Sequence, residues 1–574
     1  MKSIRSHLLF LLILIMFSIF SVLPFFHNGF FPMHDDTQVA RVYEMGQALS
    51  GGAFPVRWVK DLGYGYGYPI FNFYSPLPYY IGGGLTLFGL DALLATKITF
   101  VIGILASVVA MYFLAERFFG KKIAVLAGLL YVYFPYHAVN IYVRGALGEL
   151  FAYAFLPLVF LGLLSIHYTK PNKNSFQSTA LSILLSSISI ALVVLSHNLS
   201  AFMLFLFIAI FIVASIIFSQ EKLQRFIAYC IILVFAFLFS AFYSVPAVLE
   251  SNFTNVNSQV GGGAAYYDHF ICLPQLWDSQ WGFGGSIKGC IDGLSFRLGK
   301  FNIVLLVISL FASFLFVRKA KERKFIFLIS LGLFLASIFM SLEESRFVWE
   351  RLPYIDFLQY PWRFLNFAGL FMVIYFAYAF SLVEKTITVR SAMLYSVLLI
   401  FGIFVLNLKL FIPQSFSDRS SEAYTDKQSL VFAVSKISDE YMPKYFEKPK
   451  SLKDVKNASV EVISGSGTAQ AIDDRTTYTK SLIVMKSDGV IRINRAYFPA
   501  LKVFMDGDEA DYRVKSDGLY LDLPSGEYVI EIKFVQTFVE KVGNSLSILG
   551  FLVALIVIMG NGKIYPFWRK DVGK

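Results

Sequence analysis

Two adjacent carboxylates follow the first long apolar segment of the chain. Asp35 and Asp36 come directly after His34, and apolar side chains recur at helical spacing from Thr37 to Leu49. An aspartate at the start of a helix caps it and complements the helix dipole, and one is enough for that purpose. Two carboxylates beside a histidine therefore favour a chemical role for one of them, such as accepting a proton.

The helix that should follow these carboxylates has a polar stripe and a glycine stop. Arg41, Glu44 and Gln47 share one face, and Gly51 and Gly52 end the pattern. A short helix with one polar and one apolar face is typical of a helix that lies in the membrane interface. We therefore expect it to lie at the outer surface, with Arg41 near the carboxylates.

Further polar side chains stand at the outer ends of predicted membrane spans: His137, Arg144, Glu149, His197, Asn198, Arg346 and Arg363. An arginine at a span boundary often only anchors the helix by extending its head group to the interface. Two arginines that face one cavity can instead bind a phosphate with paired hydrogen bonds. Arg363, within Gln359-Tyr360-Pro361-Trp362-Arg363, is the stronger candidate for a phosphate contact.

The segment 250–300 adds a weak metal candidate and a disulfide candidate. Asp268 and His269 could join the first carboxylates in holding a divalent metal, although no compact ligand spacing supports a metal site. No other cofactor is indicated. Cys272 and Cys290 share one predicted outer segment and can pair, whereas Cys230 lies alone in a span.

These residues must be positioned by a membrane-embedded scaffold. The 574 residues are 56% hydrophobic and only 16% charged, whereas soluble proteins average about 25% charged residues. Apolar runs of roughly 17 to 25 residues recur, the length that crosses the hydrocarbon core. We predict twelve spans, near residues 8–26, 94–115, 123–139, 150–167, 178–195, 199–218, 226–249, 301–317, 325–341, 363–383, 391–411 and 543–560.

The distribution of basic residues orients these spans and argues against nucleic-acid binding. The formal charge is +11, but Lys and Arg concentrate in the short loops and the termini, which are therefore cytoplasmic. The long segments 27–93, 250–300, 342–362 and 412–542 then lie outside the cytoplasmic membrane. The first apolar run, after Lys2 and Arg5, reads as an uncleaved span, because it is long for a signal sequence and no cleavage pattern follows it.

Two features of the first outer segment and the spans refine this prediction. Residues 75–92 are too short for a crossing and read as an interfacial or re-entrant helix. Residues 63–74 interleave aromatic residues with glycine and proline, which suits either a sugar-binding loop or an interfacial aromatic belt. The span centres carry almost no charge, which favours chemistry at the outer face over ion-coupled transport.

Residues 412–542 change to a soluble pattern. Strand-like runs at 459–463, 481–485, 490–493 and 528–532 are separated by turn sequences such as Ser487-Asp488-Gly489. Short strands at this spacing favour a β-sandwich. The predicted organisation is a transmembrane domain at 1–411, an extracytoplasmic β-sandwich at 412–542, and a last span with a cytoplasmic tail at 543–574.

Several of these motifs resemble known families. An acidic pair opening the first outer loop, followed by an Arg-bearing helix, resembles the GT-C glycosyltransferases, which include protein O-mannosyltransferases. Five motifs are similar to the "6-pyruvoyl-tetrahydropterin synthase-related" membrane proteins: His34-Asp35-Asp36, Arg144-Gly145-Ala146, Ser196-His197-Asn198, Trp281-Gly282-Phe283-Gly284 and Gln359-Tyr360-Pro361-Trp362-Arg363. No His-rich zinc site of a soluble pterin enzyme accompanies them.

The GT-C resemblance implies an inverting glycosyltransferase that uses a polyprenyl-phosphate-linked sugar at the outer face. It implies Asp35 or Asp36 as the general base, with Asp35 preferred. His34, Arg41, Arg144, Glu149, His197, Asn198 and Arg363 are the expected substrate-binding residues. The expected partners are the lipid-linked donor, membrane lipids and a glycan, lipid or protein acceptor. The alternative is a non-catalytic or transport component of envelope-polysaccharide assembly.

Overall fold

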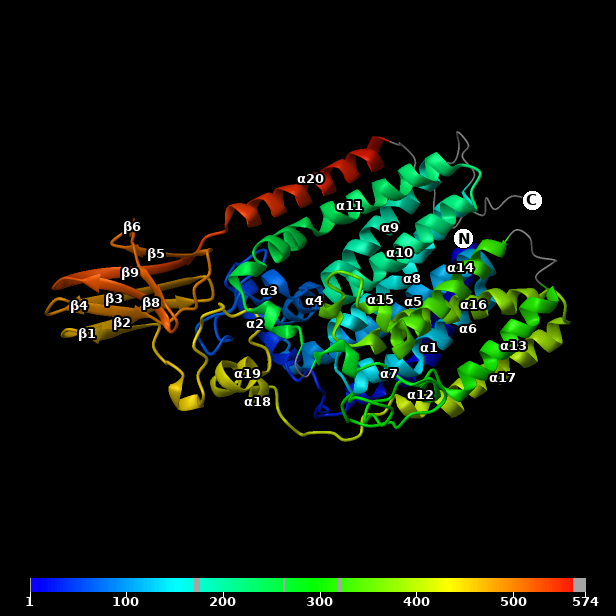
Figure 1. Cartoon of the computed structure of the whole chain (residues 1–574), viewed down its shortest axis with the longest axis horizontal. Coiled ribbons are helices and arrows are strands. Elements are labelled where there is room, and N and C mark those ends of the chain that lie inside the picture. The colour runs from blue at the N-terminus through cyan, green and yellow to red at the C-terminus, as the bar shows by residue number, and fades with distance from the viewer. Residues whose placement is uncertain (1, 170–175, 262–263, 317–322, 561–574) are drawn as a thin grey trace.

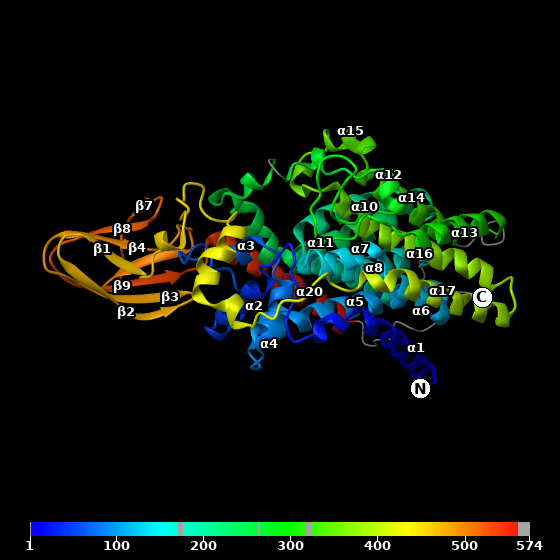
Figure 2. The same cartoon turned by 90° about the horizontal axis from the view of Figure 1, so that it is seen from below.

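The computed structural model describes residues 2–169, 176–261, 264–316 and 323–560. A bundle of long helices makes up most of the molecule, and a β domain continues from one end of it (Figure 1). The view from below separates the same two parts (Figure 2). The basic loops 170–175 and 317–322 and the tail 561–574 lie outside the described residues.

Each of the twelve predicted spans falls on an apolar helix. Within the described ranges, nine helices have the length and composition to cross a membrane, or ten when the bent pair α6 and α7 counts as one span. Two apolar stretches, Ser6–Ser21 and Lys300–Phe316, are shorter. The bundle helices are α1 (Lys2–Ser18), α5 (Ala92–Phe119), α6 (Lys121–Val132), α7 (Pro135–Tyr142), α8 (Leu147–Tyr168), α9 (Phe176–Ser196), α10 (Asn198–Ile217), α11 (Lys222–Leu249), α13 (Lys300–Phe316), α14 (Lys324–Ser341), α16 (Leu365–Glu384), α17 (Val389–Asn407) and α20 (Phe538–Gly560).

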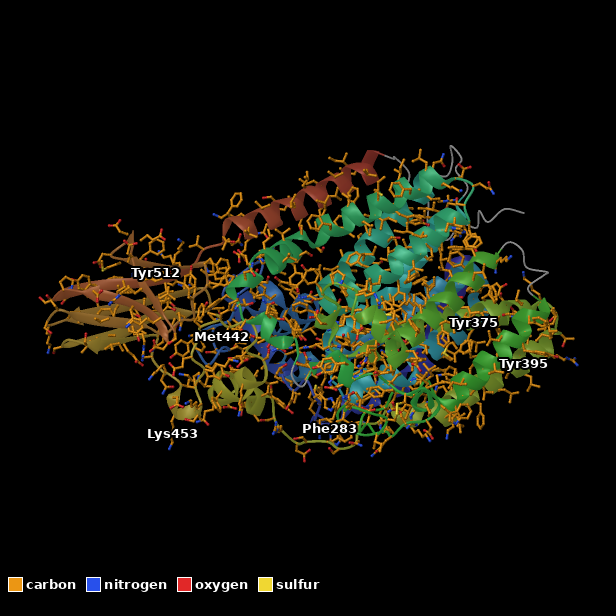
Figure 3. The ribbon with its side chains drawn as sticks, viewed as in Figure 1. Phe283, Tyr375, Tyr395, Met442, Lys453 and Tyr512 are labelled. Carbon is orange, nitrogen blue, oxygen red and sulfur yellow. A yellow bond between two sulfur atoms is a disulfide. The ribbon has the colours of Figure 1, made fainter. Side chains whose placement is uncertain are left out.

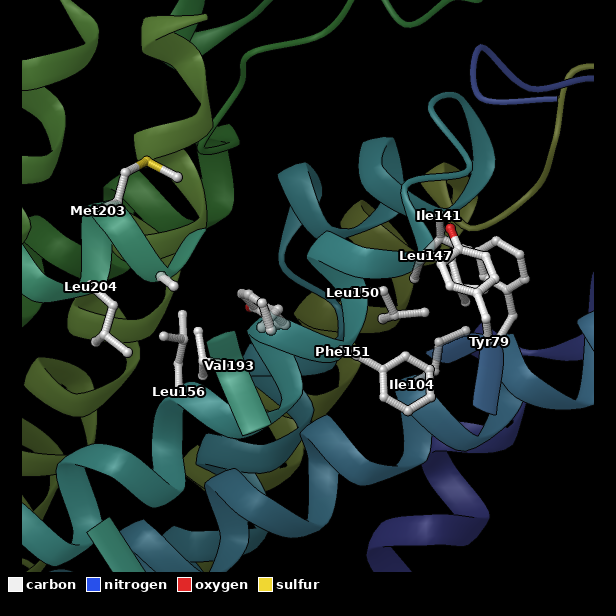
Figure 4. Packing of buried hydrophobic residues seen from close by; sticks show 14 of the residues in the cluster. Tyr79, Ile104, Ile141, Leu147, Leu150, Phe151, Leu156, Val193, Met203 and Leu204 are labelled. Carbon is white, nitrogen blue, oxygen red and sulfur yellow. The ribbon is translucent and has the colours of Figure 1, made fainter. Parts of the chain in front are cut away.

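The most buried of the long apolar helices are α16 and α8, and α5, α9 and α10 also contribute to the interior of the bundle. Ile104, Leu150, Val193 and Met203 come from α5, α8, α9 and α10 and are fully buried (Figure 4). Small residues allow the backbones to approach closely, as is usual between membrane helices. A Cβ at Gly162 of α8 would lie 2.0 Å from the Ser186 hydroxyl of α9.

Two short helices form the first connection between spans. The predicted helix after the carboxylates is α2 (Gln38–Ser50), and the predicted interfacial helix is α4 (Leu77–Thr86). They pack so tightly that a Cβ at Gly83 would lie 2.8 Å from the backbone nitrogen of Gly46. The polar stripe of α2 differs from our prediction, because Arg41 and Glu44 are only 5% and 1% exposed. A segment from far along the chain covers that face instead of water.

The β domain has two antiparallel sheets, with strand orders β1-β4-β8-β7 and β2-β3-β9-β5-β6. Its strands are β1 (Val460–Ser464), β2 (Gly467–Arg475), β3 (Tyr478–Met485), β4 (Gly489–Ile493), β5 (Leu501–Met505), β6 (Asp508–Glu509), β7 (Arg513–Lys515), β8 (Gly518–Leu523) and β9 (Gly526–Phe534). Alternate residues such as Ile483, Ile491, Leu521 and Ile530 are buried between the two layers seen in Figure 2.

The strands begin later than the predicted domain boundary at residue 412. Residues 412–459 contain α18 (Glu422–Thr425), a π-helix (Ser429–Val434) and α19 (Ser435–Ile437) in place of strands. Leu430, Val431 and Val434 are buried, and Val431 contacts the first loop at Gly65. This segment therefore packs on the first loop and links the bundle to the sheets.

The aromatic-glycine segment 63–74 lies in the core between the bundle and the C-terminal part of the chain. Tyr66 packs edge-on against Phe446 at 5.0 Å, and Tyr68 lies 5.9 Å from Tyr441. Tyr66 and Tyr68 are at most 3% exposed. Packing against residues distant in sequence leaves the rings of Tyr66 and Tyr68 inaccessible, which contradicts the prediction of an open sugar-binding loop.

Candidate functional site

A buried carboxylate gathers several of the predicted substrate-binding residues. Glu149, in the first turn of α8, is 1% exposed. Arg144 donates two hydrogen bonds of 2.7 Å to its two oxygens. Arg363, just before α16, places its Nε 3.2 Å from Glu149 Oε1, and His197 Nε2 lies 3.9 Å from the same oxygen. The structure thus brings four side chains together from three separate regions of the chain.

His197 joins this cluster in its neutral form. Its Nδ1 accepts a hydrogen bond from the backbone N–H of Ser200, so the proton is on Nε2 and directed towards Glu149. Burial lowers the pKa of His197 to about 4 despite the nearby Glu149 carboxylate. At neutral pH the cluster therefore holds two guanidinium groups and one carboxylate.

Two asparagines that the sequence analysis did not single out complete the network. Asn140 Oδ1 accepts a hydrogen bond of 2.7 Å from Arg144, and the Asn140 amide nitrogen donates a hydrogen bond of 2.7 Å to Asn366 Oδ1. Asn366 in turn donates 3.1 Å to Glu149 Oε2. Both asparagines lie in apolar helical runs, and only their position one to two turns from Arg144 and Arg363 could have indicated them.

Some buried donors beside the cluster have no hydrogen-bond partner. Among the described residues they are Trp362 Nε1 and the Tyr136 hydroxyl, whereas Arg363 Nε forms only the ion pair with Glu149 at 3.2 Å. Trp362 also stacks under the Arg144 guanidinium at 4.8 Å. An unpaired buried donor costs about 1–3 kcal/mol. Excess positive charge together with unpaired donors is the arrangement expected of a site for an anionic group.

Asp35 is tied to this cluster through the backbone. Its N–H donates 2.9 Å to the carbonyl of Arg144, and Gln38 donates 2.9 Å to the carbonyl of Gly145. Gly145 has φ +63°, and a Cβ there would lie 2.1 Å from Met33 Sδ, so the turn requires glycine. Burial alone would lower the pKa of Arg144, but the carboxylates of Glu149 and Asp35 raise it.

Asp36 has a different environment from Asp35. Its Oδ2 lies 3.6 Å from Nη1 of Arg419, which comes from the strap 413–421 that crosses beside the first loop. Burial raises the pKa of Asp36, and Arg419 opposes that rise. The same strap pairs with the first loop between Phe30 and Ser417. Asp36 therefore helps to hold the strap, whereas Asp35 lies beside the arginine cluster through its backbone hydrogen bond to Arg144.

A disulfide-closed loop covers the approach to these residues. Cys272 and Cys290 are bonded, with Cα atoms 5.6 Å apart, which confirms the predicted pairing. Within this loop the carbonyl of Phe283 lies 2.9 Å from His34 Nε2, and its N–H donates 2.9 Å to Gln414 of the strap. Phe283 lies at the edge of the molecule in Figure 3, so His34 contacts a cover and not the cluster.

The remaining predicted residues lie in other networks. Arg41 donates 2.9 Å to Ser438 and stacks over Tyr74 at 4.2 Å, which holds the segment 412–459 on α2. Asn198 donates 2.9 Å to the carbonyl of Phe73 and supports the first loop. Neither residue joins Glu149.

The structure does not bring the weak metal candidates together with the first carboxylates. Asp268 lies 3.7 Å from Lys288, and His269 contacts Ser286 at 3.0 Å. In the described ranges, no group of three or more His, Cys, Asp or Glu is arranged to hold a metal ion.

The comparison with known protein families supports a membrane protein. Residues 71–261 match the family described as "6-pyruvoyl-tetrahydropterin synthase related domain; membrane protein". No curated protein matches the sequence. Similar solved structures include oligosaccharyltransferase AglB from Archaeoglobus fulgidus (13% identity, TM-score 0.48, covering 80% of this chain and 62% of that one). They also include arabinofuranosyltransferase AftD from Mycobacteria (14% identity, TM-score 0.38, covering 72% of this chain and 28% of that one). A third is ArnT from Cupriavidus metallidurans (13% identity, TM-score 0.38, covering 75% of this chain and 76% of that one).

The chain spans less than two thirds of AglB and of AftD. The fold and the site define a polytopic, mostly helical membrane protein with a C-terminal β domain. Residues 71–261, about a third of the chain, match the model of the 6-pyruvoyl-tetrahydropterin synthase-related membrane proteins, the family that the sequence motifs resemble.

Proposed function

We propose that this protein is a membrane glycosyltransferase that transfers a sugar from a polyprenyl-phosphate donor to an acceptor hydroxyl. The observation that carries the proposal is the position of Asp35 beside the buried cluster of Arg144, Glu149 and Arg363. A partly exposed carboxylate can accept a proton, and an adjacent site with excess positive charge can hold a phosphate. Both groups are needed for glycosyl transfer from a lipid phosphate.

The proposed reaction is a single displacement. The acceptor oxygen attacks the anomeric carbon while its proton passes to the Asp35 carboxylate. The bond between that carbon and the phosphate oxygen breaks, and its electron pair leaves with the lipid phosphate. Arg363, with Arg144 behind it, stabilises the added negative charge, so no general acid is required. Attack from the face opposite the phosphate inverts the configuration.

The charge of the cluster supports a monophosphate donor. A phosphodiester carries one negative charge, which balances the net positive charge of Arg144, Arg363 and Glu149 once Asp35 has accepted the proton of the acceptor. Glu149 and the asparagines then serve as positioning residues that fix the two guanidinium groups. AglB and ArnT have been solved with dolichol-phosphate and undecaprenyl phosphate, respectively, and we extend a lipid phosphate of this kind to the present chain.

Asp35 is the better base because Asp36 is already paired with Arg419. We expect Asp35→Asn to lower the transfer rate by about 10² to 10⁴, the usual effect of losing a general base. Asp36→Asn is the matched control, since it makes the same change one residue away, and it should retain activity within about tenfold.

The test is glycan profiling of a deletion strain complemented with each variant at equal membrane levels. Full function of Asp35→Asn would refute the catalytic proposal and favour a non-catalytic role in envelope-polysaccharide assembly. Loss of function in both variants, restored for Asp36→Asn by Arg419→Gln, would place Asp36 in the strap contact and keep Asp35 as the base.

The proposed setting is the outer face of the cytoplasmic membrane, with twelve spans and both termini inside. The uneven distribution of Lys and Arg supports this orientation. Reporter fusions after Lys324 and within 460–534 should report opposite sides of the membrane. The same side for both fusions would contradict the topology.

A further inference from the structure

A groove between four helices lies in the half of the bundle far from the candidate site. It has a volume of about 270 Å³ and is lined by residues of α6, α13, α16 and α17. Apart from Ser309 and Tyr395, the lining is apolar, with Ile123, Val304 and Phe376 as examples. Tyr395 lies at the edge of the molecule opposite the β domain (Figure 3).

The groove opens sideways to the surroundings of the bundle. Val304 and Ile308 of α13 are 49% and 53% exposed, and Leu398 of α17 is 55% exposed. In contrast, Ala377 and Ala379 at the back of the groove are at most 3% exposed. α13 and α17 lie along the flank of the bundle in Figure 1, so the opening between them faces the lipid.

The length of the groove matches one leaflet of a bilayer. On α13 the lining runs from Phe301 to Ala312, about 16 Å at 1.5 Å per residue. Half of the hydrocarbon core is about 15 Å. One extended hydrocarbon chain of a membrane lipid therefore fits its length.

Positive charge marks the end of the groove at which a lipid head group would lie. Ile123, Val383 and Tyr395 line the groove close to where α6 begins, α16 ends and α17 begins. Just beyond them, Lys122, Lys385 and Arg390 are exposed, with Glu384 as the opposing charge. Three positive side chains against one negative side chain favour an anionic head group.

We propose that the groove binds one acyl chain of an anionic phospholipid, whose head group contacts Lys122, Lys385 and Arg390. The donor lipid is a poorer match, because its phosphate would lie at Arg363. The first groove residue on α16, Phe376, is about 20 Å further along the chain from Arg363. The site is thus a lipid site separate from the proposed catalytic one and does not depend on it.

The test is native mass spectrometry of the full chain in detergent with added phosphatidylglycerol, phosphatidylcholine or undecaprenyl phosphate. Val304→Trp fills the groove, and Val307→Trp is the matched control, because Val307 is on the same helix, is 59% exposed and does not line the groove. Displacing about two methylenes should weaken phosphatidylglycerol binding about tenfold in Val304→Trp and leave the control unchanged.

The charges are tested by replacing Lys122, Lys385 and Arg390 together with glutamine. Preference for phosphatidylglycerol over phosphatidylcholine should fall, whereas glutamine at the exposed residues Lys427, Lys436 and Lys453 should leave it intact. Equal binding by both Trp variants, or no preference between the two phospholipids in the unaltered protein, would overturn the proposal. Displacement of phosphatidylglycerol by undecaprenyl phosphate at equal concentration would assign the groove to the donor chain instead.

Discussion

The excess charge in the arginine cluster leads to an unusual prediction about stability. Glu149 accepts hydrogen bonds from Arg144 and Asn366 and lies 3.2 Å from Arg363 Nε. Glu149→Gln keeps the volume but removes the carboxylate with which both Arg144 and Arg363 form ion pairs, so two buried guanidinium groups lose their direct partner. Removal of one partner from a buried ion pair costs about 3–5 kcal/mol. We expect a loss of this size in the free energy of unfolding.

Arg363→Met should behave in the opposite way. It leaves Arg144 and Glu149 as a balanced pair, and it loses the ion pair from Arg363 to Glu149 at 3.2 Å and one hydrogen bond, from Arg363 to the carbonyl of Leu358 at 2.9 Å. That bond contributes about 0.5–1.5 kcal/mol, and relief of the unpaired charge offsets it. The free energy of unfolding of Arg363→Met should therefore be within about 1 kcal/mol of that of the unaltered protein, or higher, while transfer activity is lost.

The assay is denaturant unfolding of the purified protein in detergent micelles, followed by near-UV circular dichroism. Glu343→Gln is the control, since it also breaks an ion pair, with Arg346 at 2.6 Å, but at an exposed position. Its effect should be about 0–1 kcal/mol. If Arg363→Met destabilises the protein as much as Glu149→Gln does, excess charge does not govern the cluster and the reasoning fails.

Three further predictions concern the turn, a buried carboxyl and the disulfide. Gly145→Ala should destabilise the protein by more than about 2 kcal/mol in the same assay, because of its positive φ and close contact, whereas Gly285→Ala, with open space around it, should be neutral. Burial and a neighbouring carboxylate raise the pKa of Glu44 above its ordinary 4.5. The proton bound to Glu44 therefore contributes fully to the free energy of unfolding below about pH 4.5, and this contribution is lost as pH rises through the folded-state pKa. Glu44→Gln should flatten this decline and be more stable at pH 8; an unchanged pH profile would contradict it. Loss of the bond between Cys272 and Cys290 should cost about 2–4 kcal/mol and speed proteolysis of that loop; equal cleavage with and without reductant would show that the bond does not order it.

Local patterns were sufficient to predict most elements of the fold. The apolar runs became helices, and the alternating runs at 481–485, 490–493 and 528–532 lie in β3, β4 and β9. These patterns depend on neighbours within a few residues, which a sequence displays directly. The boundary of the β domain was missed, because 412–459 takes its structure from contacts with the first loop.

The candidate site was predicted in part for the same reason. Arg144, Glu149 and Arg363 could be singled out because the span centres carry almost no charge, so that the few charges at the outer ends of the spans stand out. Their convergence with Asn140 depends on how α7, α8 and α16 pack, which no local pattern contains. Arg41 was misplaced because its partner Ser438 lies 397 residues away.

The burial of the aromatic-glycine segment has a consequence for the synthesis of the protein. The Tyr68 hydroxyl accepts a hydrogen bond from the backbone N–H of Tyr441, which lies 373 residues later in the chain. At 5–20 residues per second, the ribosome needs about 20–75 s to make that interval. The first loop therefore lacks this contact during that interval, even though every residue of the arginine cluster, up to Asn366, has already been synthesised. Chains arrested before residue 412 should lose segment 63–74 to protease, whereas full-length chains should keep it; equal resistance would show that the loop folds without its later partner.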